Sequence, residues 1–363
     1  MPSCLLHWAR GLIKTQNRMT TKKTKRIIRV LLLVGTIISL YFVPWPIVIA
    51  WIAPLPDTVQ EQVNKAPDYG FDGIIVYVDK KGEPPAFYTA GVKSREGEIP
   101  ADPQSLFKIA SVSKIYTAVA IAKLASQGRL SLDKTLADYF PELVGRIENA
   151  DKITVKMMVQ HRSGIPNYTD TKNYWVYPKK NDRERLALVL DLPANFEPGT
   201  DYEYSNTNYL LLSQLIERVT NGTKFQFIKE AILDPLDLEN TYGSIQDVDL
   251  DEVMSGYYVG YEQDLKTDDN GVMLATAEDL GKFIRALNEG SVFKDQKEQE
   301  LYSSIYRYEH TGLIPGYQTI AKWHKDIDTV IIQFTNTVDF GGYNWNMSEV
   351  MYNRIVKIVS DTD

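Results

Sequence analysis

A largely apolar stretch that begins just after a serine and a lysine constrains the fold more than any other part of this sequence. Residues 115–124 read Ile-Tyr-Thr-Ala-Val-Ala-Ile-Ala-Lys-Leu, which predicts a helix buried in a core. Ser111 and Lys114 precede this run at a spacing of three, so a helix starting here would place both on one face. The free N–H groups of a first helical turn would also point toward a negative charge at Ser111. Ser111 is therefore a candidate nucleophile, and Lys114 is a candidate base.

The Ser-x-x-Lys spacing alone is weak support for this interpretation. The same spacing occurs at Ser105 with Lys108 and at Ser131 with Lys134, and the latter follows Gly128 in a stretch typical of a turn or a helix cap. A frame this short arises by chance about once or twice in a chain of this length. The interpretation of Ser111 therefore depends on the other motifs in the chain.

The composition is that of a globular protein with an unusual distribution of charge. The 363 residues are 44% hydrophobic and carry a net charge of −7. No acidic residue precedes Asp57, whereas eight basic residues do, so the rest of the chain has 32 basic against 47 acidic residues. An acidic globule without a basic stripe argues against nucleic acid as a partner.

The N-terminal region predicts export from the cytoplasm. Residues 30–53 contain no charged residue and would span about 36 Å as a helix, enough to cross a hydrocarbon core of ~30 Å. The basic residues lie on the N-terminal side, so we expect residues 1–29 to form a cytoplasmic tail and the chain after residue 53 to lie outside, on the periplasmic side of the inner membrane. We expect an uncleaved single-pass anchor; the alternative is a signal peptide, because Pro44 and Pro46 interrupt the run. Met19 is an alternative start, and Cys4, the only cysteine, would lie in the tail.

After the apolar segment, the pattern predicts an α+β domain at 71–363, preceded by a tether at 54–70. Strands are predicted at residues 72–79, 86–92, 303–309, 317–325 and 328–336, and a closing helix at 348–359. The middle, about 130–270, is predicted to be mainly helical, with a helix at 208–220 and a long surface loop at 244–271, and another helix is predicted from Thr276 to Gly290. The expected fold is one antiparallel sheet of about five strands, built from both ends of the domain and flanked by helices.

Three short motifs follow one another along this domain. Ser111-Val112-Ser113-Lys114 opens a helix, Tyr204-Ser205-Asn206 enters a second helix, and His310-Thr311-Gly312 lies at the end of a predicted strand. The sequence resembles the serine-active, penicillin-recognising family: class C β-lactamases and their D-alanyl-D-alanine carboxypeptidase, D-aminopeptidase and esterase relatives. The stretches Gln160–Tyr168, Pro198-Gly199, Asp234–Thr241 and Gly316-Tyr317 support the resemblance, which covers about residues 70–340.

The resemblance implies a role for each motif residue. Ser111 would attack a carbonyl and form an acyl-enzyme, with Lys114 and Tyr204 sharing the proton transfers; which of the two acts as base stays open. The backbone N–H groups of Ser111 and Leu313 would form the oxyanion hole. Asn206 would hold the substrate amide, and Thr311 of the His310-Thr311-Gly312 motif would hold the far end of the substrate. His161 and Arg162 are interpreted as structural.

One departure from the family pattern affects the expected substrate. Many β-lactamases and carboxypeptidases have lysine where this chain has His310, and histidine is mostly neutral at pH 7. We therefore expect a small-molecule or peptide substrate, either a D-amino-acid peptide or an ester. The alternatives are a class C β-lactamase and a non-catalytic envelope protein of the same fold. Four histidines and one distant cysteine form no metal-ligand cluster, so no metal and no cofactor are expected. The oligomeric state is left open.

Overall fold

A computed structural model describes residues 22–179 and 181–361, and the chain divides into two compact units at Ala53 and Pro54. The predictions for residues 1–21, including those on Cys4 and Met19, lie outside the described residues.

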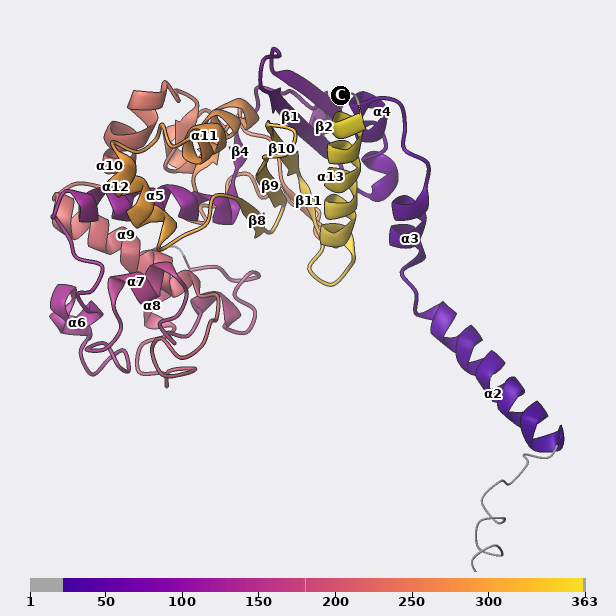
Figure 1. Cartoon of the computed structure of the whole chain (residues 1–363), viewed down its shortest axis with the longest axis horizontal. Helices are drawn as coiled ribbons and strands as arrows, with labels where there is room; N and C mark the ends of the chain where they lie inside the picture. Colours follow the sequence, from indigo (N-terminus) through magenta and orange to yellow (C-terminus); the bar gives the residue numbers. More distant parts are fainter. Residues whose placement is uncertain (1–21, 180, 362–363) are drawn as a thin grey trace, which may run out of the picture. The chain divides into compact units, whose positions relative to one another are not determined.

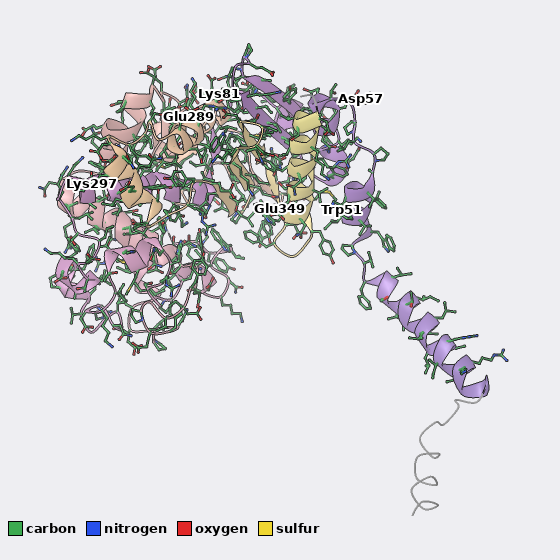
Figure 2. All side chains as sticks on the ribbon, viewed as in Figure 1. Trp51, Asp57, Lys81, Glu289, Lys297 and Glu349 are labelled. Carbon is green, nitrogen blue, oxygen red and sulfur yellow. The ribbon has the colours of Figure 1, made fainter. Side chains whose placement is uncertain are left out.

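The apolar N-terminal segment forms two helices instead of one. Helix α2 spans Lys22–Tyr41 and α3 spans Trp45–Ile52, with a bend of 83° between their axes. The bend follows from Pro44 at the N-cap of α3 and Pro46 in its first turn, neither of which can donate a backbone hydrogen bond. Among the described residues, no single helix is long and apolar enough to cross a membrane, but this bent pair could do so by length and composition. Its apolar side chains are largely exposed, as Trp51 in Figure 2 illustrates.

The second unit is built on an antiparallel sheet of six strands in the order β3-β2-β1-β10-β9-β8 (Figure 1). The chain enters it through β1 (Gly73–Lys80), β2 (Ala86–Ser94) and β3 (Ile99–Pro100) and returns through β8 (His310–Ile314), β9 (Tyr317–His324) and β10 (Thr329–Thr335). Strands β1 and β10 pair from Ile74 with Thr335 to Lys80 with Thr329. The α+β prediction and the assembly of the sheet from both ends are thus confirmed. Four of the five expected strands are present, and β8 and β3 complete the sheet.

Helices cover both faces of this sheet. Helix α11 (Ala277–Glu289) packs on the face that carries Tyr77, where Gly281 leaves room for the tyrosine ring. Helix α13 (Asn344–Asp361) packs on the opposite face, where Gln333 donates to the hydroxyl of Ser348. Charged side chains such as Lys81, Glu289 and Glu349 lie on the outside of the unit (Figure 2).

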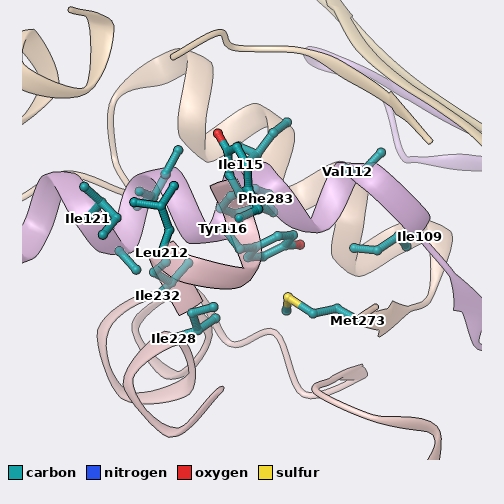
Figure 3. Close-up of a cluster of buried hydrophobic side chains, with 14 of the residues drawn as sticks. Ile109, Val112, Ile115, Tyr116, Ile121, Leu212, Ile228, Ile232, Met273 and Phe283 are labelled. Carbon is teal, nitrogen blue, oxygen red and sulfur yellow. The ribbon is translucent and has the colours of Figure 1, made fainter. Parts of the chain in front are cut away.

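Between the two halves of the sheet, the chain forms a mainly helical region around α5 (Ser113–Ser126). All side chains of α5 from Lys114 to Leu124 are buried. Figure 3 shows Ile115, Tyr116 and Ile121 of α5 among side chains of the surrounding helices. The other helices are α6 (Leu136–Tyr139), α7 (Val155–Val159), α8 (Asp182–Ala187), α9 (Asn206–Thr220), α10 (Lys224–Ile228) and α12 (Gln296–Ser303). Short strands complete the unit: β4 (Phe107–Lys108), β5 (Thr241–Tyr242), β6 (Tyr257–Tyr258), β7 (Leu274–Ala275) and β11 (Thr337–Val338).

Three of the predicted segments differ from the structure. The predicted tether contains helix α4 (Val59–Val63), which packs on α13, where Arg354 donates to Gln62 at 2.8 Å. The predicted strand at 303–309 is wrong, because Ser303 ends α12 and the strand begins at His310. The predicted surface loop at 244–271 is buried over 253–257, since Met254 N–H donates to Leu106 and Tyr257 N–H donates to Asn336.

Candidate active site

Ser111 lies in a tight turn that leads directly into α5. The turn, Ala110–Val112, is a 3₁₀ helix, and Ala110 has a φ of +50°, a left-handed conformation that costs an L-residue about 1–2 kcal/mol. Lys114 follows in the first turn of α5, and its Nζ donates to Ser111 Oγ at 3.3 Å and to Asn206 Oδ1 at 2.8 Å. The predicted pairing of serine and lysine on one helical face is therefore present in the structure.

Tyr204 and Asn206, at the start of α9, contact Ser111 and Lys114 respectively. The Tyr204 hydroxyl donates to Ser111 Oγ at 2.7 Å, and Lys114 Nζ lies 5.0 Å from the centre of the Tyr204 ring. The Asn206 side chain is fixed on its other side by Asn167 Oδ1 and Thr169 Oγ1, which accept from its Nδ2 at 3.3 and 3.1 Å. Ser111 Oγ is thus contacted by a phenol and by an ammonium group, and an asparagine joins the ammonium group to the loop at 167–169.

Strand β8 passes close to the serine turn because it contains Gly312. A Cβ atom at this position would lie 2.5 Å from the carbonyl oxygen of Ile109 and 3.2 Å from the backbone nitrogen of Ser111. A real side chain cannot approach that closely, so glycine is required here. β8 is an edge strand, paired only with β9 in the six-stranded sheet.

The alternation of an antiparallel ladder gives Leu313 its place in the site. The turn Pro315-Gly316 joins the closing pair, Ile314 with Tyr317. If that pair exchanges the hydrogen bonds of the tight turn, the N–H groups of Thr311 and Leu313 face the free edge of β8. Leu313 follows Gly312, the position that approaches the Ser111 backbone nitrogen, so its N–H is the candidate second donor of an oxyanion hole beside the Ser111 N–H.

His310, at the start of β8, supplies no permanent cation to the site. Its ring stacks on Tyr306, with ring centres 6.0 Å apart, and its Nδ1 contacts the carbonyl oxygen of Thr311. Burial lowers the pKa of His310 to about 4, so the imidazole is neutral at pH 7.

His161 is a supporting residue of the site to which the sequence reasoning gave only a general structural role. It is buried, and its ring stacks on Tyr204 with centres 4.4 Å apart. Its Nδ1 accepts from the backbone N–H of Ser205 at 3.1 Å, so one side chain holds both the plane of the phenol and the chain beside it. Burial, followed by the charge of Lys114, lowers the pKa of His161 to about 3. Asn167 and Thr169 were also not given roles, although His161 and Asn167 lie in the stretch 160–168 that carried the resemblance.

A cavity of ≈ 500 Å³ adjoins Lys114 and Asn206. Its wall includes buried Arg185, which donates to Asp182 Oδ1 at 2.9 Å and to the carbonyl oxygens of Lys179 and Asp269. This guanidinium therefore joins two loops that border the site. Within residues 25–179 and 181–361, no group of three or more His, Cys, Asp or Glu side chains is arranged to hold a metal ion.

Comparison with known families assigns the chain. Residues 49–307 match the family model described as Beta-lactamase, which is well over half of the sequence. The chain belongs to the beta-lactamase family. Ser111, Lys114 and Tyr204, which are in contact as described above, all lie within the matched residues. The match ends before His310, so the contribution of β8 rests on the geometry above.

Individual relatives share the family at low identity. Protein flp of Staphylococcus aureus (strain MW2) is 27% identical over 264 residues, covering 69% of this chain and 51% of that protein. N-acetylmuramyl-L-alanine amidase of Bacillus subtilis (strain 168) is 28% identical over 205 residues, covering 52% of this chain and 46% of that protein. The chain thus spans about half the length of these curated relatives.

Solved structures share the fold of this beta-lactamase family member. D-amino acid amidase from Ochrobactrum anthropi SV3, complexed with L-phenylalanine amide, superposes with a TM-score of 0.72 at 21% identity, over 84% of this chain and 98% of that one. The octameric penicillin-binding protein homologue from Pyrococcus abyssi gives a TM-score of 0.67 at 22% identity, over 82% and 75%.

Replacing His161 should change how stability depends on pH. Below pH ~6.5, the unfolded chain takes up a proton on this imidazole that the folded chain binds only near pH 3, so acid destabilises the fold by up to ~1.4 kcal/mol per pH unit. In His161→Asn, this contribution should disappear, and the asparagine oxygen can still accept from Ser205. Urea unfolding at pH 6.5, 5.5 and 4.5 measures the difference in slope. Equal slopes in the two proteins would contradict the assignment, and comparison at pH 7.5 reports whether the variant is folded.

Proposed function

We propose that this chain is an acyl-transfer hydrolase that uses Ser111 as nucleophile on D-amino-acid peptides or amides, or on small esters. The observation that carries the proposal is the placement of Ser111 Oγ within hydrogen-bond reach of both Tyr204, at 2.7 Å, and Lys114, at 3.3 Å. A serine hydroxyl is a weak nucleophile until a neighbouring group takes its proton, and both candidates are in place.

The reaction would proceed in two steps on the same groups. Ser111 Oγ attacks the substrate carbonyl while its proton passes to the Lys114–Tyr204 pair, and the N–H groups of Ser111 and Leu313 stabilise the oxyanion, each worth about 3 kcal/mol. The proton then passes to the leaving amine or alcohol as the acyl-enzyme forms. A water molecule, deprotonated by the same pair, attacks the ester and releases Ser111 and the acid.

The surroundings of β8 support substrates that lack a strong carboxylate requirement. A cation at His310 would pair with a substrate carboxylate, but the half-buried imidazole is neutral above a pKa of about 4. Thr311, half-buried on the same strand, offers a neutral hydroxyl for the far end of the substrate. Asn206 would contact the substrate amide, because it lines the cavity of ≈ 500 Å³ beside Lys114.

The proposal is tested by labelling and by turnover in the same samples. The full chain should form a covalent fluorophosphonate adduct on the peptide that contains Ser111, located by mass spectrometry. It should also hydrolyse p-nitrophenyl acetate, and Ser111→Ala should abolish both reactions. An adduct on another residue, or neither adduct nor turnover in the folded wild type, would sink the proposal and favour a non-catalytic binding protein.

The class C β-lactamase alternative is separated by changing the charge at His310. At pH 7, His310→Lys should raise the rate constant for acylation by nitrocefin about tenfold or more relative to p-nitrophenyl acetate turnover, because a charge-assisted hydrogen bond to the carboxylate is worth about 1.5–3 kcal/mol. The neutral variant His310→Gln is the matched control. If the wild type already hydrolyses nitrocefin as fast as His310→Lys, the β-lactamase alternative is favoured instead.

We also propose that the bent helix pair anchors the chain in a membrane, with the catalytic unit on the outer, periplasmic side. Two observations support an anchor: residues 30–53 carry no charge, and the apolar side chains of α2 and α3 are exposed. The orientation is supported by the basic residues Lys25, Arg26 and Arg29, which precede residue 30. A C-terminal fusion to alkaline phosphatase, which is active only outside the cytoplasm, should show activity in intact bacteria. The same fusion lacking residues 22–53 should be inactive, and an inactive full-length fusion that is expressed intact would contradict the proposal.

A further inference from the structure

An aromatic cavity at the end of β8 has no role in the chemistry described so far. Its volume is ≈ 300 Å³, at the lower end of the ~300–1,000 Å³ range of small-molecule pockets, which suits one side chain better than a whole peptide. The ring-bearing and apolar residues of its wall include Trp175, Tyr258, Tyr261, Leu265 and Pro315.

This cavity is tied to the catalytic groups through three independent connections. Pro315 follows Ile314 and stands two positions after Leu313, the proposed oxyanion donor. Asn270 lines both this cavity and the one that contains Lys114 and Asn206. Lys108, three residues before Ser111, donates from its buried ammonium to the carbonyl oxygens of Leu265 and Asp268 at 2.8 and 2.6 Å.

The rings of the wall pack against one another and against Phe340. Tyr258 packs against Tyr261 and against Phe340 with ring centres 5.4 Å apart in each case, and Trp175 contacts Phe340 at 6.0 Å. Tyr261 is nevertheless 46% exposed and Val176 is 47% exposed, so apolar surface is left uncovered at the cavity. An apolar ligand group would cover it and gain the hydrophobic contribution.

The direction of β8 decides which end of the substrate reaches this cavity. Thr311 and Pro315 are four residues apart, about 13 Å along a strand, and the oxyanion donor Leu313 lies between them. In the proposed reaction, Thr311 holds the far end of the substrate. If that end carries the leaving group, the acyl side of the scissile carbonyl extends toward Pro315.

We infer that the Trp175–Tyr258–Tyr261 cavity is a specificity site that binds an aromatic side chain on the acyl part of the substrate. The inference rests on the proposed function and narrows it to aryl-bearing acyl groups. Three groups on the rim, Gln263, Asp268 and Asn270, are polar and would lie beside the backbone of the substrate and not beside the ring.

The test compares esters that differ only in the acyl group. With p-nitrophenol as the constant leaving group, kcat/KM for the 3-phenylpropanoate should exceed that for the acetate by about tenfold or more. Tyr261→Ala should reduce this ratio about tenfold, and Val176→Trp, which fills the cavity from an exposed position, should reduce it as well. Tyr177→Ala is the matched control, since Tyr177 lies on the same loop, is 73% exposed and does not line the cavity.

The possible outcomes separate the inference from the proposed function. Acetate turnover that depends on Ser111, without an aryl preference, overturns the cavity assignment and leaves the proposed function intact. Equal losses on both esters in Tyr261→Ala place the leaving group in the cavity and overturn the acyl-side assignment. An equal preference for p-nitrophenyl hexanoate overturns the aromatic class. Absence of turnover with every ester in the folded wild type counts against the proposed function itself.

Discussion

The burial of α5 on all sides is the constraint on which the site depends. A helix without a polar face is stable only inside a core, and the side chains of α5 from Lys114 to Leu124 are buried there. Its first turn, with Lys114 and the preceding Ser111, is therefore held by packing and not by the site itself. Helix α9 packs against α5 and β8 packs against the Ala110–Val112 turn, so the other candidate catalytic groups are placed relative to the same helix.

Two backbone conditions then set the distance between β8 and the serine. Ala110 takes a left-handed conformation, with a φ of +50°, and Gly312 has no Cβ to strike the Ile109 carbonyl. Both conditions lower the stability of the folded chain, because left-handed alanine is strained and glycine loses more conformational entropy on folding than other residues. The fold accepts them at the point where β8 comes closest to the backbone of Ser111.

The sequence predicted the parts of the site that follow from local periodicity and missed those that depend on tertiary contacts. Ser111 and Lys114 were found because helical spacing places them on one face, and Thr276 and Gly290 because caps have a local signature that the structure reproduces around α11. His161 was not assigned to Tyr204, because the stacking of the two rings joins residues far apart in the chain. The helix at 59–63 was missed for a related reason: it is short, and its stability comes from packing on α13. The segment 303–309 was assigned to a strand because its tyrosines alternate with polar residues. In the structure, Tyr306 and Tyr308 lie in a loop, where they pack on Tyr209 and Tyr302.

The two ends of β8 together suggest how substrate binding is divided. At the His310 end, the neutral imidazole cannot make the charge-assisted hydrogen bond that a lysine would make to a substrate carboxylate. Such a bond contributes about 1.5–3 kcal/mol to binding. At the Pro315 end, an aromatic cavity could recover a similar amount, since full burial of a large apolar side chain contributes about 1.5–3 kcal/mol. The hydrophobic contribution does not need a charged substrate, and it acts on the acyl part that remains bound to Ser111 after the leaving group departs. A site with this division would hold its acyl-enzyme by the ring of the substrate, and the leaving group would be free to vary between amine and alcohol.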